Sequence, residues 1–109
     1  MSEDSKPGTI GWVDLAVGDA EKVRDFYCSV VGWSHAPVDM GGYSDFVMLA
    51  PGSGQAVAGV CHARGTNEGL PAVWMVYLMV ENLDESVKQV VALGGKVLVG
   101  PKDLGPQGR

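Results

Sequence analysis

The sequence has few basic residues and no long apolar run. Its 109 residues include 8 Lys and Arg against 13 Asp and Glu, which gives a formal net charge of −5 at pH 7. Nucleic acids and anionic membrane surfaces both attract basic proteins, so we expect neither as a partner. No apolar stretch approaches the roughly 20 residues that span a bilayer, and residues 1–8 contain no apolar signal core. We therefore expect a cytoplasmic protein.

The sequence also lacks the common catalytic and cofactor motifs. We find no Ser-His-Asp or Cys-His spacing, no phosphate-binding loop and no zinc pattern. The two cysteines, Cys28 and Cys61, lie far apart and form no CxxC motif, so we expect free thiols. With 46% hydrophobic residues, the chain can form the core of one globular domain.

The order of apolar patterns and turn residues predicts an α+β fold after a disordered arm at residues 1–8. The first helix should begin after the N-cap Asp19 and end at Gly32. The second should begin after Asn82, with Glu85 as its capping-box partner, and stop at Gly94-Gly95. Strands are predicted over residues 9–17, 34–38, 45–50, 56–62, 72–80 and 96–99.

The sequence matches itself when it is shifted by 63 positions. Val13 then falls on Val76 and Asp19 on Asn82, and no gap is needed from the first strand to the end of the helix. Any two strand–helix units share aliphatic alternation, but here the caps, the stops and the strand phase agree at one offset. We therefore predict one domain over 9–109, with a first module at 9–63 and a second at 72–109. The second should be incomplete in this chain, because its last strands would begin near residue 109.

Two stretches carry a resemblance to a known family, WVDLAVGDAEKVRDFYCSVVGW at 12–33 and WMVYLMVENLDESVKQVVALGGKVLVGP at 74–101. Together they resemble the vicinal oxygen chelate superfamily, which includes glyoxalase I, bleomycin-resistance proteins and extradiol dioxygenases. The resemblance implies tandem βαβββ modules that form a curled mixed sheet, or half-barrel. It also implies helices on the convex face and a ligand on the concave face.

In metal-using members of that superfamily, each module contributes a ligand from the middle of its first strand. The resemblance places these positions at Trp12 and Met75 and a third near Val60–His62. Neither Trp nor Met suits a hard divalent ion, which prefers imidazole nitrogen or carboxylate oxygen. We therefore expect no metal of the family type and no cofactor.

Strand phase predicts which residues line the ligand pocket. In the first strand Val13, Leu15 and Val17 should pack on the helices, so that Trp12, Asp14 and Ala16 face the other way. Under the 63-residue shift Tyr77 falls on Asp14, and Phe46 and Met48 are expected on the same face. The predicted ligand-binding residues are Trp12, Asp14, Phe46, Met75 and Tyr77. This lining suits a ligand with a flat or aliphatic body and a polar tip.

Structural roles compete with these assignments. Asp14 could be held by a neighbouring strand or by Arg64, and Met48 and Met79 could simply fill the core. His62 could be a ligand or a general base, but a surface histidine is the favoured interpretation. Cys61 has no partner that would form a thiolate, so it is not expected to be a nucleophile.

Three functions follow from these observations. The favoured one is a homodimeric protein of the bleomycin-resistance type, which binds a small-molecule ligand without chemistry. The second is a lyase or dioxygenase of the glyoxalase I or extradiol type that depends on a divalent metal. The third is a metal-free enzyme that uses Asp14 and Tyr77 as an acid–base pair.

Overall fold

A computed structural model describes residues 6–100 of the chain. The chain divides into two compact units, one formed by Trp12–Tyr77 and the other by Met1–Gly11 together with Leu78–Arg109. Most of the predicted N-terminal arm, residues 1–5, and the last nine residues of the predicted second module, 101–109, lie outside the described residues.

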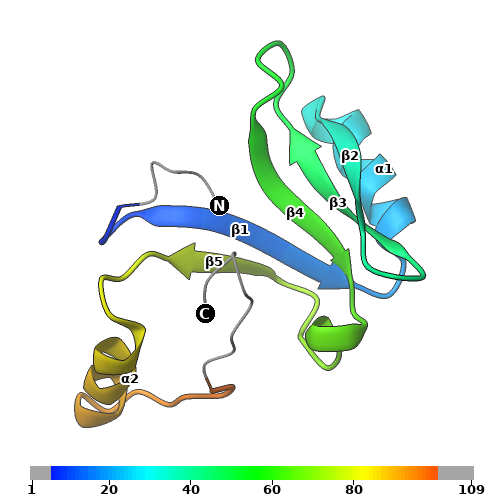
Figure 1. Ribbon diagram of the computed structural model, residues 1–109. Coiled ribbons are helices and arrows are strands. Elements are labelled where there is room, and N and C mark those ends of the chain that lie inside the picture. The colour runs from blue at the N-terminus through cyan, green and yellow to red at the C-terminus, as the bar shows by residue number, and fades with distance from the viewer. Residues whose placement is uncertain (1–5, 101–109) are drawn as a thin grey trace. The chain divides into compact units, whose positions relative to one another are not determined.

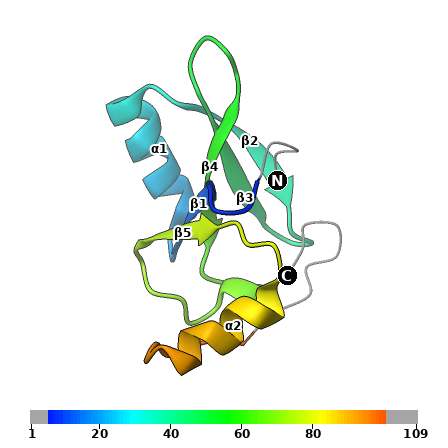
Figure 2. The same cartoon turned by 90° about the vertical axis from the view of Figure 1, so that its left-hand side faces the viewer.

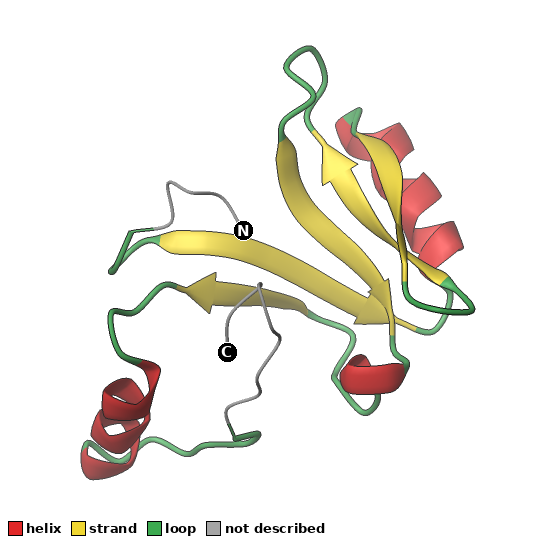
Figure 3. Ribbon diagram, viewed as in Figure 1, coloured by secondary structure: helices red, strands yellow, loops and turns green. Residues whose placement is uncertain are grey.

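One five-stranded mixed sheet has the strand order β2-β3-β4-β1-β5 and is not closed (Figures 1 and 3). Strand β1 is parallel to β4, whereas β2 with β3 and β3 with β4 are antiparallel. This arrangement confirms the predicted α+β class. The strands are β1 (Ile10–Val17), β2 (Ser34–Asp39), β3 (Ser44–Leu49), β4 (Ala56–His62) and β5 (Trp74–Leu78).

Helix α1 (Ala20–Val31) begins and ends at the predicted residues. The Asp19 carboxylate accepts a hydrogen bond from the Lys22 backbone N–H at 3.1 Å, so it caps the first turn. Gly32 ends the helix in the left-handed region, with φ of 85°, and its N–H donates to the Cys28 carbonyl. Only glycine adopts this conformation without strain, which explains why the helix stops there.

The core of the larger unit lies where α1 packs against one face of the sheet (Figure 2). Its buried side chains are apolar and come from α1, β3 and β4: Ala20, Phe46, Met48, Ala58 and Val60. Val13 and Val17 of β1 pack against this cluster, as the strand phase predicted. The face of β1 that carries Trp12 and Asp14 is therefore the face away from α1.

The predicted phase of β3 is wrong. Phe46 and Met48 were expected on the ligand face, but both are buried in the core beneath α1. The run from Phe46 to Leu49 is apolar at every position, so it contains no alternation from which a phase could be read. Phe46 and Met48 fill the space beneath α1, and Val47, which lies between them, faces the opposite side of the sheet.

The smaller unit contains α2 (Leu83–Ala92), which begins as predicted. The Asn82 side chain accepts a hydrogen bond from the Glu85 backbone N–H at 3.1 Å. The helix ends at Ala92, two residues before the position that the 63-residue repeat gives, and Gly94 of the predicted Gly94-Gly95 stop follows in the left-handed region, with φ of 91°. Thr9 and Met79 also pair in this unit, through a bond from the Met79 N–H to the Thr9 carbonyl at 2.8 Å.

The predicted strand at 96–99 is not formed. Residues 95–100 contain no strand, and Leu98 is 82% exposed. A strand needs a neighbour for its backbone N–H and C=O groups, and no described strand pairs with this segment. Strand β5 is likewise shorter than the predicted 72–80. Within residues 6–100, neither helix has the length and apolar character needed to cross a membrane.

Candidate functional site

Asp14 is the centre of a polar cluster on the sheet face away from α1. Its Oδ1 accepts a hydrogen bond from the Trp12 indole Nε1–H at 2.6 Å, and its Oδ2 accepts one from the Tyr77 hydroxyl at 2.9 Å. Asp14 and Trp12 are partly buried, and Tyr77 is 38% exposed. The cluster therefore joins β1 to β5 while it stays within reach of solvent.

A glycine in the next strand makes room for the carboxylate. Asp14 is paired with Gly59 of β4 in the parallel register, so the two residues occupy the same row of the sheet. A Cβ atom at Gly59 would overlap Asp14 Oδ1 and would lie 3.3 Å from Trp12 Nε1. The site thus depends on a residue that has no side chain.

The prediction of site residues did not include Gly59. The sequence does contain a signal for it, because a glycine inside a strand often marks a close approach by another group. The pattern alone could not show which group approaches, since β1 and β4 are joined only by parallel pairing across more than 40 residues.

The electrostatics of this face keep its titratable donors protonated. Burial raises the pKa of Tyr77 to about 12, and the negative charge of Asp14 and the hydrogen bond to it add to the effect. Burial also raises the pKa of the Cys61 thiol to about 12, with smaller contributions from Asp14 and Asp45. Both groups remain neutral near pH 7, so Cys61 is not poised as a nucleophile, as expected from the sequence.

The structure brings together three of the five predicted ligand-binding residues, Trp12, Asp14 and Tyr77. Met75 is partly buried and lies two positions before Tyr77 on β5, so strand alternation places it on the same face. Phe46 does not belong to this face: it lies in the core, and the guanidinium of Arg24 on α1 is 4.5 Å from its ring centroid.

Of the two structural partners considered for Asp14, a neighbouring strand and Arg64, only the strand contacts it. Its partner Tyr77 comes from the neighbouring strand β5. Arg64, the other partner considered, instead lies over the ring of Tyr43, at 4.0 Å from the centroid. The carboxylate therefore accepts one hydrogen bond on each oxygen, both from uncharged donors, and it is still partly exposed.

An aromatic cluster on the opposite face fixes the phase of β5. The Trp74 indole N–H donates to the Tyr27 hydroxyl at 3.0 Å, and Trp33 packs against both rings. Since Trp74 faces α1, alternation turns Met75 and Tyr77 toward Asp14. The residues that carried the family resemblance at the end of the first helix thus help to position the site.

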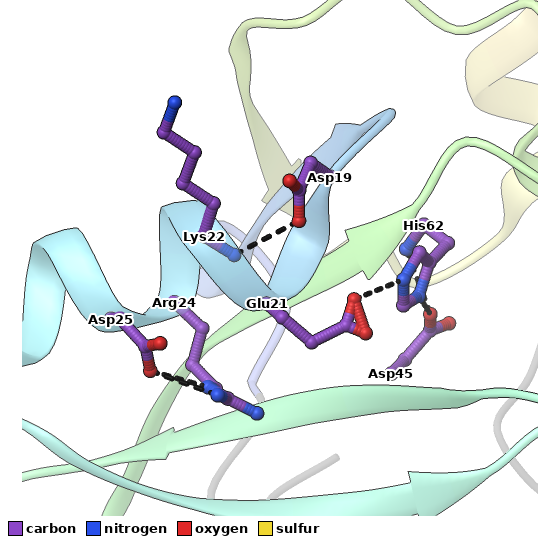
Figure 4. A network of polar contacts seen from close by, with 7 residues as sticks. All are labelled: Asp19, Glu21, Lys22, Arg24, Asp25, Asp45 and His62. Atoms are coloured by element: carbon purple, nitrogen blue, oxygen red, sulfur yellow. Dashed lines mark hydrogen bonds and ion pairs between the residues drawn. The ribbon is translucent and has the colours of Figure 1, made fainter.

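His62 lies in a second polar cluster, in which His62 and Asp45 are buried and Glu21 is exposed (Figure 4). Its Nε2 is 2.8 Å from Glu21 Oε1, and its Nδ1 is 3.3 Å from Asp45 Oδ1. Asp45 also accepts a hydrogen bond from the His62 backbone N–H at 2.8 Å. The interpretation of His62 as a surface residue is wrong, because it is 8% exposed. Its contacts tie the first turn of α1 to the ends of β3 and β4.

The residues at the two metal positions implied by the resemblance do not fit a divalent ion. The Trp12 nitrogen is a donor without a free lone pair, and it is engaged with Asp14. Met75 offers only a thioether, which hard ions bind poorly. Across residues 6–100 the structure contains no group of three or more His, Cys, Asp or Glu side chains that could hold a metal ion.

Comparison with known proteins gives the family. The model of the Glyoxalase/Bleomycin resistance protein/Dioxygenase superfamily matches residues 9–109. The chain belongs to this superfamily. It is 34% identical over 105 residues to CFP32 of Mycobacterium tuberculosis (strain CDC 1551 / Oshkosh), a protein whose name includes the word glyoxylase. It is also 31% identical over 118 residues to the anthracycline biosynthesis protein DnrV of Streptomyces peucetius.

These superfamily members are longer than the chain. The matches cover 95% and 94% of this chain but only 40% of CFP32 and 42% of DnrV. The chain therefore spans about two fifths of the length of the relatives that it matches.

Proposed function

We propose that this superfamily member binds a small organic molecule on the open sheet face around Trp12, Asp14 and Tyr77, without a divalent metal and without covalent chemistry. The observation that carries the proposal is the partly exposed Asp14 carboxylate, held between two aromatic side chains above Gly59. A carboxylate oriented in this way offers a polar anchor beside aromatic surface. That combination is typical of small-molecule sites, which are mainly apolar with a few oriented polar groups.

The names of related proteins support the same class of ligand. DnrV is named for anthracycline biosynthesis, and the superfamily is named in part for bleomycin resistance. Both names refer to small organic molecules rather than to nucleic acids or membranes. The net charge of −5 agrees with that choice.

The structure disfavours the two enzymatic alternatives. A metal-dependent lyase or dioxygenase would need ligands at Trp12 and Met75, which do not fit a divalent ion. A metal-free acid–base enzyme would rely on Tyr77 beside Asp14. General acid–base catalysis works best when the pKa of the group is close to the working pH, and the pKa of Tyr77 is raised to about 12.

The proposal can be tested with ¹⁵N-labelled protein and a library of flat, uncharged or cationic organic fragments. We expect binding fragments to shift the Trp12 indole N–H signal and the backbone signals of Asp14 and Tyr77. The variant Asp14→Asn should weaken binding far more than it lowers the free energy of unfolding. The matched control Tyr43→Phe removes a hydroxyl outside this face and should leave binding unchanged. Fragment shifts that gather on another surface, or none at all, would overturn the proposal.

Metal analysis of the purified protein, combined with mass spectrometry of co-purifying molecules, tests the rest of it. A stoichiometric divalent ion lost on substitution of Trp12 or Met75 would contradict the metal-free assignment. An organic molecule released on denaturation would identify the class of ligand directly.

A further inference from the structure

We propose that this site selects ligands that bring hydrogen-bond donors, namely ammonium or hydroxyl groups on a flat organic body, and rejects anionic ligands. The inference rests on the proposed function and specifies its ligand class. It comes from counting which donors and acceptors the cluster around Asp14 still has to offer.

The donors of the cluster are already used. The indole of Trp12 has one N–H and no acceptor, and that N–H is directed at Asp14 Oδ1. The hydroxyl of Tyr77 has one hydrogen, and it is directed at Asp14 Oδ2. Neither side chain has a polar hydrogen left for a ligand.

The acceptors of the cluster are only partly used. An ionised carboxylate has about four lone-pair positions, and Asp14 uses one on each oxygen. The Tyr77 oxygen, having given its hydrogen, can still accept. A ligand that reaches this cluster therefore meets acceptors only, and a ligand carboxylate, phosphate or sulfonate would find no donor there.

Charge acts in the same direction. Among the ion pairs of residues 6–100, none joins Asp14 to a Lys, Arg or His side chain. Arg24 lies over Phe46 and Arg64 lies over Tyr43, so neither neutralises the site. The raised pKa values of Tyr77 and Cys61 reflect, after burial, the negative charge of Asp14. An anionic ligand would be repelled, whereas an ammonium group would form a charge-assisted hydrogen bond.

Gly59 also leaves the carboxylate without cover from β4. The space that a Cβ atom at Gly59 would take is filled by Asp14 Oδ1 itself, so the carboxylate lies directly against the β4 backbone. Gly59 has no side chain that could cover the other side of the carboxylate.

Four small probes with one ring each separate donor capacity from charge. Benzylamine carries a cationic donor, benzyl alcohol a neutral donor, benzyl methyl ether no donor and benzoate an anion. Each is titrated into ¹⁵N-labelled protein at low salt and at 150 mM salt, with the Trp12 indole N–H as reporter. We expect benzylamine to bind at least about tenfold more tightly than benzoate, since a hydrogen bond to a charged group typically corresponds to a tenfold or larger change. We expect benzyl alcohol to bind more tightly than its methyl ether.

Two variants connect the preference to the counted groups. Asp14→Asn removes the charge and adds an N–H donor, so the ratio of benzylamine to benzoate affinity should fall to within about threefold of one. Tyr77→Phe should keep the preference, because it frees a carboxylate lone pair, and Tyr43→Phe should leave all four affinities unchanged. Melting temperatures verify that each variant folds.

The outcomes distinguish the two proposals. If none of the probes or library fragments shifts Trp12, Asp14 or Tyr77, the proposed function fails. If benzoate binds at these residues as tightly as benzylamine, or the ether as tightly as the alcohol, the binding site stands and the donor preference is overturned. The same result follows if Asp14→Asn leaves the ratio of affinities unchanged.

Discussion

Replacing Gly59 by alanine tests the geometry of the site more directly than removing any of its side chains. The added Cβ would overlap Asp14 Oδ1, so the carboxylate must rotate away from its position. Gly59 does not have a positive φ, so alanine brings no backbone strain at this position. The effect of Gly59→Ala should therefore come from the collision with Asp14.

The size of the effect follows from the bonds that the rotation breaks. Asp14 accepts two hydrogen bonds, and a bond to a charged group contributes about 1.5–3 kcal/mol. Because the cluster is partly exposed, water replaces part of what is lost, so we expect Gly59→Ala to lower the free energy of unfolding by about 2 kcal/mol. The Trp12 indole N–H signal should move at the same time.

A double-mutant cycle separates the collision from other effects. In an Asp14→Ala background the new Cβ has room beside a shortened side chain, and alanine is favoured over glycine in a strand by about 0.5–1 kcal/mol. Gly59→Ala should then be neutral or stabilising. Urea unfolding of the four proteins measures the difference, which we expect to be about 2–3 kcal/mol. Equal costs of Gly59→Ala in both backgrounds would refute the argument.

Four further predictions concern other parts of the chain. Because burial raises the pKa of Cys61 to about 12, iodoacetamide at pH 8 should alkylate it at least about 100-fold more slowly than a free thiol, and Asp14→Asn should speed the reaction; mass spectrometry measures both rates. The hydrogen bond from His62 lowers the pKa of Glu21 below its usual value of 4.5. The ionised Glu21 therefore stabilises the fold at pH values above 4.5, and this stabilisation is lost as the pH falls through the lowered pKa. Glu21→Gln should therefore flatten the dependence of stability on pH between 3 and 6, and an unchanged curve would contradict this. Gly32→Ala should cost about 1 kcal/mol in thermal unfolding, because the left-handed φ disfavours a side chain. The predicted homodimer is checked by light scattering at micromolar concentration, where a clean monomer would count against it.

Much of the local structure could be predicted because its causes are local. The caps at Asp19 and Asn82 act on backbone groups three residues away, so the sequence contains both partners close together. The phase of β1 was predicted because Val13 and Val17 alternate with polar or small residues. The pairing of Asp14 with Tyr77 followed from that phase and from the 63-residue repeat, and the structure confirms the contact.

The rest depends on partners that are distant in the sequence. Nothing close to His62 indicates that it is buried, since Asp45 and Glu21 are 17 and 41 residues away. The uniformly apolar run around Phe46 could face either way until the space beneath α1 selected the larger side chains. The residues at 96–99 have strand-like composition, but a strand requires a neighbour and not composition alone.

The contact between Asp14 and Tyr77 also determines which copies of the repeat can pair. The two residues occupy equivalent positions, 63 apart, on strands that are neighbours in the sheet. If two first copies met in this way, two carboxylates would face each other and repel. If two second copies met, two phenols would meet with no charge to accept their hydrogens. The difference at this one position therefore favours the pairing of β1 with β5 over the pairing of either strand with a second copy of itself.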